Sequence, residues 1–245
     1  MRVSTSAYAV TGLGFTPPWE VNAGFICGSE KTLVVDTGPT YYAARTIYGY
    51  ALAAAPSNAM IAVNTEMHVD HLMGNCFFQE MSVPIWGHEK CVRAPDALDS
   101  NAAEYNAAIP DPARRDMNEA AVFFKGSRIV NPSHMIARAT RFDLGGLEVD
   151  VIPAPGHTPA NMLVHVPSQK VLFTGDIVVS DYAPNLESGG PGEWTQWLSA
   201  LEVVRSLSPR VLVPGHGRVL EGADIDAQIR RVQEVLQYEI AAERA

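Results

Sequence analysis

Apolar runs that end in a turn with an acidic or histidine side chain recur along this chain of 245 residues. The first ends at Asp36 in VVDTG, and the richest is NTEMHVDHLMGN, which begins at residue 64. Three later turns follow the same plan: PGHTP with His157, FTGDIV with Asp176 and PGHGR with His216. Proteins usually present functional side chains on loops held by a rigid scaffold. The recurrence therefore predicts a strand-rich fold with polar groups at its strand ends.

Strand and turn signals fill both halves of the chain. EVNAGFIC and KTLVVDTG are joined by Gly28-Ser29-Glu30, which predicts a hairpin. Gly145-Gly146 separates two further strands, and a turn near Pro167 separates another pair. Two segments show helical periodicity that favours core packing, with apolar residues at Trp194, Trp197, Leu198 and Leu201, and at Ile225, Ile229, Val232, Leu236 and Ile240. These patterns predict two packed sheets covered by helices, an α/β layered domain.

Residues 93–135 differ from the rest because they are rich in Ala, Asn, Asp and Pro. Helical pieces interrupted by Pro110 and Pro112 are the expected structure. Such a segment could shape a pocket or a subunit contact.

Charge and cysteine usage exclude some classes of function. The net charge of −9 argues against a nucleic-acid surface and against binding to anionic membranes. Three widely spaced cysteines favour a reducing compartment. The N-terminal residues show no apolar signal-peptide region, so we expect a cytoplasmic protein.

The stretch NTEMHVDH contains four residues of metal-binding types within six positions. Glu66, His68 and Asp70 alternate, so their side chains would share one side if the segment were extended. His71 would point elsewhere unless the chain turns.

In the order of its motifs, the chain resembles the metallo-β-lactamase superfamily. That family has the pattern His-x-His-x-Asp-His, then a lone His, a lone Asp and a final His; the matching residues here are Glu66, His68, Asp70, His71, His157, Asp176 and His216. The resemblance covers nearly the whole chain and implies an αββα four-layer sandwich of two mixed β-sheets flanked by helices. Residues 1–245 would then form one domain, with the 93–135 segment as a helical insertion.

The resemblance also implies a site for two divalent metal ions, zinc first, with manganese or iron as alternatives. Site one would use Glu66, His68 and His157, site two would use Asp70, His71 and His216, and Asp176 would bridge them. Asp36 would support the metal ligands as an outer carboxylate that does not itself bind metal. A metal-bridging hydroxide would be the nucleophile, and the catalytic Asp70 would orient or deprotonate it. The implied reaction is metal-assisted hydrolysis.

Glu66 departs from the family pattern, which has histidine there. Three interpretations compete: Glu66 is a carboxylate ligand, site one is lost, or the whole site is degenerate and the chain is a structural subunit. We favour the first, because Glu is a normal zinc ligand and the other motif residues remain. An oxygen ligand also makes manganese or iron more competitive with zinc.

Small-molecule hydrolysis of an ester, lactone, amide or activated ether is the expected activity. Phe15 and Trp19, in the loop between the first two strands, and Tyr182 would line an apolar mouth for an uncharged or aromatic substrate. For Trp19, simple packing on the sheet is a nearly equal alternative. Two other functions stay open, a mononuclear iron oxidoreductase of the persulfide dioxygenase type and a partner-dependent or non-catalytic subunit. Homo- or hetero-oligomers also stay open.

Overall fold

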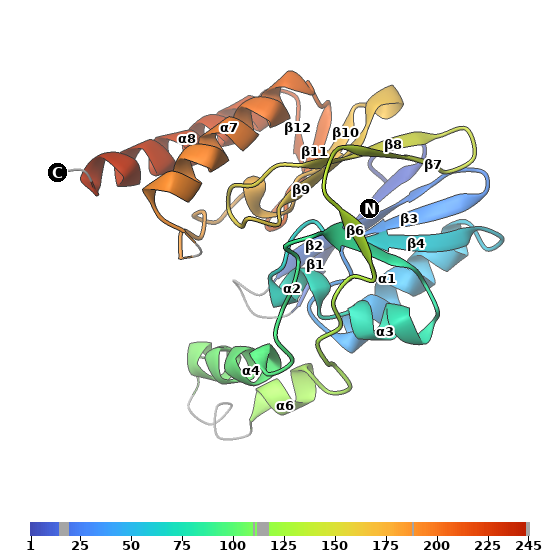
Figure 1. The fold of residues 1–245 in the computed structure, drawn as a ribbon. Helices are drawn as coiled ribbons and strands as arrows, with labels where there is room; N and C mark the ends of the chain where they lie inside the picture. Colours follow the sequence, from blue (N-terminus) through green and yellow to red (C-terminus); the bar gives the residue numbers. More distant parts are fainter. Residues whose placement is uncertain (15–19, 110, 112–117, 188, 244–245) are drawn as a thin grey trace.

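Two six-stranded sheets lie face to face in the computed structural model, which describes residues 1–14, 20–109, 111, 118–187 and 189–243 (Figure 1). The first sheet follows chain order, and its strands are β1 (Ala7–Leu13), β2 (Val21–Cys27), β3 (Lys31–Val35), β4 (Ala59–Val63), β5 (Ile85–His88) and β6 (His134–Ile136). Strands β1 to β3 pair antiparallel, whereas β3 to β6 pair parallel. The sheet is therefore mixed.

The second sheet is also mixed and also follows chain order. Its strands are β7 (Thr140–Asp143), β8 (Glu148–Pro153), β9 (Met162–Val166), β10 (Val171–Phe173), β11 (Val211–Val213) and β12 (Leu220–Glu221). Only β10 and β11 pair parallel; the other neighbours pair antiparallel.

The predicted turns are present. Strands β2 and β3 form a hairpin across residues 28–30. Gly145 and Gly146, between β7 and β8, have φ angles of 93° and 75°, a backbone region that glycine tolerates without strain. A single 3₁₀ turn, η1 (Pro167–Gln169), connects β9 to β10.

Helices cover the outer face of each sheet, so the layers run α, β, β, α (Figure 1). Helices α1 (Tyr41–Ala54) and α3 (Asn75–Glu80) pack on the first sheet; α7 (Pro191–Ser206) and α8 (Ala223–Ala242) pack on the second. Between the sheets, Leu33 and Val63 belong to the same buried cluster as Val164 and Phe173. The predicted αββα sandwich is confirmed.

Helix α1 lies in a segment for which the sequence patterns above predict no helix. Thr40 begins it by accepting a hydrogen bond from the Ala43 N–H at 3.0 Å. Its buried positions are Ala44, Ile47 and Ala51. Two of these three are alanines, so the apolar stripe is a weak signal.

The segment of residues 93–135 is helical where the structure describes it. Helices α4 (Ala97–Ala108) and α6 (Glu119–Phe123) pack together around buried Tyr105 and Phe124. Pro110 and Pro112 lie outside the described residues. The assignment of residues 1–245 to one domain with this segment as an insertion stays a prediction. No helix among the described residues is long and apolar enough to cross a membrane.

Candidate metal centre

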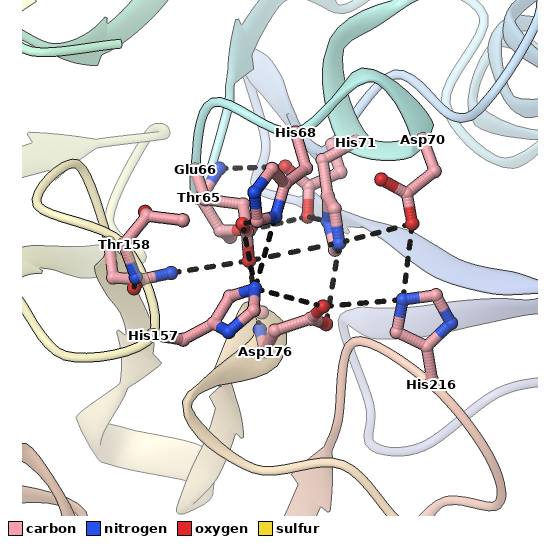
Figure 2. A network of polar contacts seen from close by, with 12 residues as sticks. Thr65, Glu66, His68, Asp70, His71, His157, Thr158, Asp176 and His216 are labelled. Carbon is pink, nitrogen blue, oxygen red and sulfur yellow. Dashed lines mark hydrogen bonds and ion pairs between the residues drawn. The ribbon is translucent and has the colours of Figure 1, made fainter. Parts of the chain in front are cut away.

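The ligand-type side chains that follow β4 meet those of the three later motifs in one cluster (Figure 2), and Asp36 of the first motif contacts His71. Residues 65–68, which follow β4, form bends, and the short helix α2 (Val69–Leu72) begins directly after His68. The segment is thus not extended through position 70, because Asp70 and His71 lie on a helix. From the second half, His157 follows β8, Asp176 lies in the 3₁₀ turn η2 (Gly175–Ile177) and His216 follows β11.

A first group of ligand-type atoms comes from Glu66, His68, His157 and Asp176, which lie within 4.8 Å of one another. His68 Nδ1 lies 2.8 Å from Glu66 Oε2 and 3.0 Å from His157 Nε2. His157 Nε2 lies 3.5 Å from Glu66 Oε2 and 3.6 Å from Asp176 Oδ2. Glu66 is therefore in the same cluster as the histidines.

Asp70, His71 and His216 form a second group. His216 Nε2 lies 3.1 Å from Asp70 Oδ2 and 3.3 Å from Asp176 Oδ2. His71 Nε2 lies 3.4 Å from Asp176 Oδ1. Asp176 thus contacts members of both groups, which is the position expected of a bridging carboxylate.

Oxygen atoms behind the cluster orient three of the histidine rings. Nδ1 of His71 lies 2.9 Å from Asp36 Oδ2, Nδ1 of His216 lies 2.6 Å from the Glu20 carbonyl, and Nδ1 of His157 lies 3.0 Å from the Asn185 carbonyl. With Nδ1 hydrogen-bonded to an oxygen atom, each ring directs its Nε2 at the centre of the cluster. Asp36 was expected to hold ligands in this way. The carbonyl contacts have no sequence signal, because every residue has a carbonyl.

Glu66 is fixed through one of its two carboxylate oxygens. Its Oε1 accepts hydrogen bonds from Asn161 Nδ2 and from the Asp176 N–H, both at 3.2 Å. Its Oε2 faces the cluster, where its near neighbours are the ring nitrogens of His68 and His157. Asn161 was not predicted, because an asparagine in a turn is common and gives no distinct signal.

Buried polar atoms that face one another indicate that a divalent cation fits this cluster. Glu66 Oε2, His71 Nε2 and Asp176 Oδ1 are all buried, and their near neighbours among the described residues are other ligand-type atoms rather than well-aligned hydrogen-bond partners. Buried polar atoms are rarely left in this state, and each costs about 1–3 kcal/mol if nothing binds it. Imidazole nitrogen and carboxylate oxygen are the donors that Zn²⁺ accepts, so the residues present fit the metals that the sequence pattern implies.

The electrostatics of the cluster also favour positive charge at its centre. Burial raises the pKa of Asp176, but His216 and His71 outweigh burial and hold this pKa well below its ordinary value. Burial likewise lowers the pKa of His216, yet Asp176 and Asp70 bring it well above 6.5. The pKa of His71 is raised well above its ordinary value by Asp70 and Glu66 against the effect of burial. Without a metal, the carboxylates thus favour protonated rings.

A pocket of about 440 Å³ opens over the cluster. Tyr182 lines it, as predicted, whereas Phe15 and Trp19 lie outside the described residues. Helix α4 contributes one face to the wall, with Ala97, Ser100, Asn101 and Glu104. The segment of residues 93–135 therefore shapes the pocket, one of its two expected uses. Arg93, which also lines the pocket, was not predicted, because a single arginine in a loop has no distinct pattern.

The other histidines and cysteines lie outside both groups. His88 Nδ1 accepts a hydrogen bond from the Lys90 N–H at 3.1 Å, and His134 is exposed. His165 is buried in β9. Cys76 and Cys91 are buried free thiols, as expected.

Comparisons with known proteins agree with the fold. The chain is 21% identical over 233 residues to a linear primary-alkylsulfatase from Pseudomonas sp., covering 85% of this chain and 44% of that protein. It is 26% identical over 222 residues to an acyl-coenzyme A thioesterase from Gallus gallus, covering 80% and 72% of the two chains. The chain thus spans less than half the length of the alkylsulfatase.

Among solved structures, a metallo-beta-lactamase from Pontibacter korlensis superposes with a TM-score of 0.70 at 22% identity, covering 97% of each chain. The sequence profile of the metallo-beta-lactamase superfamily matches residues 16–216, which include every residue of both groups. On this match, and on the confirmed sandwich, the chain belongs to the metallo-beta-lactamase superfamily.

Proposed function

We propose that this chain is a metal-dependent hydrolase with a binuclear centre. Glu66, His68 and His157 would hold one ion, and Asp70, His71 and His216 the other, with Asp176 shared between them. The observation that supports this most is the contact of Asp176 with histidines of both groups. The buried Oε2 of Glu66, which faces the ring nitrogens of His68 and His157, supports its inclusion as a ligand.

Two divalent ions would supply Lewis acidity and lower the pKa of a bound water toward neutrality. The protein itself would orient the attacking water and accept its proton. Asp70 lines the pocket and contacts His216, so its carboxylate can accept a proton from an attacking water. Burial raises the pKa of Asp70, but His71 and His216 outweigh burial, and the group stays ionised at neutral pH.

The substrate class we propose is a small molecule with an ester, lactone, amide or activated ether bond. Relatives named as an alkylsulfatase, an acyl-coenzyme A thioesterase and a hydroxyacylglutathione hydrolase support cleavage of bonds of the ester type. Zinc is the first candidate metal, and the carboxylate of Glu66 keeps manganese and iron as alternatives. The expectation of an uncharged or aromatic substrate depended mainly on Phe15 and Trp19, which lie outside the described residues.

The test is hydrolysis of a panel of aryl esters, lactones, thioesters and sulfate esters by protein reconstituted with zinc, manganese or iron. We expect metal-dependent turnover of at least one class, lowered by about 10²-fold or more in Asp70→Asn if Asp70 handles the proton. His134→Ala is the matched control, because His134 is exposed and lies outside the cluster. Oxygen consumption by a single-iron form without any hydrolysis would contradict the proposal, and so would inactivity relieved only by a second protein.

A further inference from the structure

Arg93 is a cation in the pocket that neither metal group uses. It lies in the loop between β5 and α4, and its backbone is fixed on both sides by one side chain. The Arg93 N–H donates to Asn131 Oδ1 at 2.8 Å, and Asn131 Nδ2 donates to the Arg93 carbonyl at 3.0 Å. This reciprocal pair holds the start of the arginine side chain in place.

The guanidinium is also held through its Nε atom. Arg93 Nε donates to the Met67 carbonyl at 2.8 Å, and Met67 directly precedes His68 in the metal cluster. The two terminal nitrogens have no hydrogen-bond or ion-pair partner among the described residues. A planar guanidinium offers two parallel N–H groups to a carboxylate, sulfate or phosphate, so the free end of Arg93 is prepared to bind an anion.

The other charges in the pocket leave Arg93 available to bind an anion. Among the described residues that line the pocket, Arg93 is the one lysine or arginine. Asp70 and Asp176 belong to the metal cluster, where two divalent ions would offset their charges and that of Glu66. Glu104 and Glu187 also line the pocket but are exposed, so water and salt screen their charges.

We propose that Arg93 binds an anionic group of the substrate, which makes the preferred substrates small esters that carry a carboxylate or a comparable oxyanion. The inference rests on the proposed hydrolase function and names the charge of its substrate. It replaces the expectation of an uncharged substrate. Because the Met67 carbonyl anchors the guanidinium and Asn131 fixes the backbone of Arg93, less side-chain entropy is lost when the anion binds.

The test uses two acetyl esters of nearly the same shape, one anionic and one neutral. One is 3-acetoxybenzoate, and the other is its neutral isostere 3-acetoxybenzamide. In the metal-loaded wild type, kcat/KM should be about tenfold or more higher for the benzoate, because hydrogen bonds to a charged group favour it. Arg93→Met should lower the ratio of kcat/KM for the benzoate to kcat/KM for the benzamide by a similar factor, mainly through a higher KM for the benzoate, while the protein retains its metal.

Two variants serve as controls. Arg45→Met makes the same change in net charge at an exposed position of α1, outside the pocket lining, and should leave the kinetics on both esters unchanged. Arg93→Lys keeps the charge without the planar fork and should retain part of the preference. A wild type without preference would overturn the proposal. A parallel loss on both esters in Arg93→Met, with loss of metal, would also overturn it, because Arg93 would then act only through the Met67 carbonyl.

A binding measurement separates this proposal from the hydrolase function. Calorimetry with 3-hydroxybenzoate and 3-hydroxybenzamide reports anion binding by the metal-loaded protein whether or not any ester is cleaved. Binding of the benzoate that is weakened about tenfold in Arg93→Met would support the Arg93 site even if hydrolysis failed. Equal binding of the benzoate by wild type and Arg93→Met would overturn it even if hydrolysis succeeded.

Discussion

The two ligand groups of the candidate centre differ in how the protein holds them. In the second group, His71 is fully buried and is fixed by Asp36, and His216 is fixed by the Glu20 carbonyl. In the first group, the Asn185 carbonyl fixes His157, but the side chain of His68 is 21% exposed, and a glutamate stands where the family pattern has histidine. The fold therefore fixes both histidines of the second group, whereas the first group depends also on the contacts of Glu66.

The largest expected difference between the groups is in the stability of the metal-free protein. His71→Ala would leave Asp36 buried without its charged partner, at a cost of about 3 kcal/mol in the free energy of unfolding. Glu66→Ala should cost less than half as much, since water can fill the space and hydrate Asn161. Urea unfolding of both variants measures this.

Metal analysis of the same variants completes that comparison. The metal content of each variant should fall from about two ions per chain to about one, because each substitution removes a ligand from one group. Unchanged metal content in Glu66→Ala would show that Glu66 is not a ligand. Equal losses of stability in the two variants would remove the distinction between the groups.

A smaller effect should isolate the first group. Asn161→Asp replaces the amide donor to Glu66 Oε1 with a second carboxylate while preserving shape. We expect the affinity of one ion to fall about 10–100-fold, with the other unchanged, in a competition assay against a chelating dye. Asn185→Asp is the matched control, because Asn185 contacts His157 through its backbone carbonyl. An equal loss of affinity in this control would attribute the effect to added charge rather than to the orientation of Glu66.

The smallest expected effect is a dependence on pH that comes mainly from the second group. The raised pKa values of His71 and His216 stabilise the metal-free protein below about pH 6.5, and this contribution is lost as pH rises through the folded-state values. Metal binding needs deprotonated rings, so it strengthens over the same range. The increase in Tm on adding zinc should thus be larger at pH 8 than at pH 6, by about 3 °C or more.

Variants assign that pH dependence to a group. His216→Ala should flatten the rise in zinc stabilisation with pH more than His68→Ala, because the pKa of His216 is raised well above its ordinary value and that of His68 is raised less. Thermal unfolding with and without zinc at several pH values measures both slopes. Equal flattening by the two variants would contradict the assignment.

The clustering of the motif residues could be predicted from the sequence because these residues lie in short turns directly after strands. His157, Asp176 and His216 each follow an apolar run, and such local patterns survive folding. Asn161 and Arg93 escape prediction because their function depends on contacts with Glu66 and Met67, which are far away in the chain. Long-range partners of this kind have no local pattern.

The helices show the same limit. The wide apolar stripe of α8 predicts its buried residues correctly. Helix α1 buries mostly alanine, and its position depends on the sheet that it covers. The bend before α2 also escapes prediction, since alternation over three residues fits an extended segment equally well.

Each sheet is built from consecutive strands, the first within residues 7–136 and the second within residues 140–221. During synthesis, the part of the chain with Glu66, His68, Asp70 and His71 therefore leaves the ribosome long before His157 does. Neither half contains a complete ligand group, because each group takes at least one histidine from the second half. We therefore expect a newly made chain to remain metal-free until its two halves dock, so that metallation marks the completion of folding.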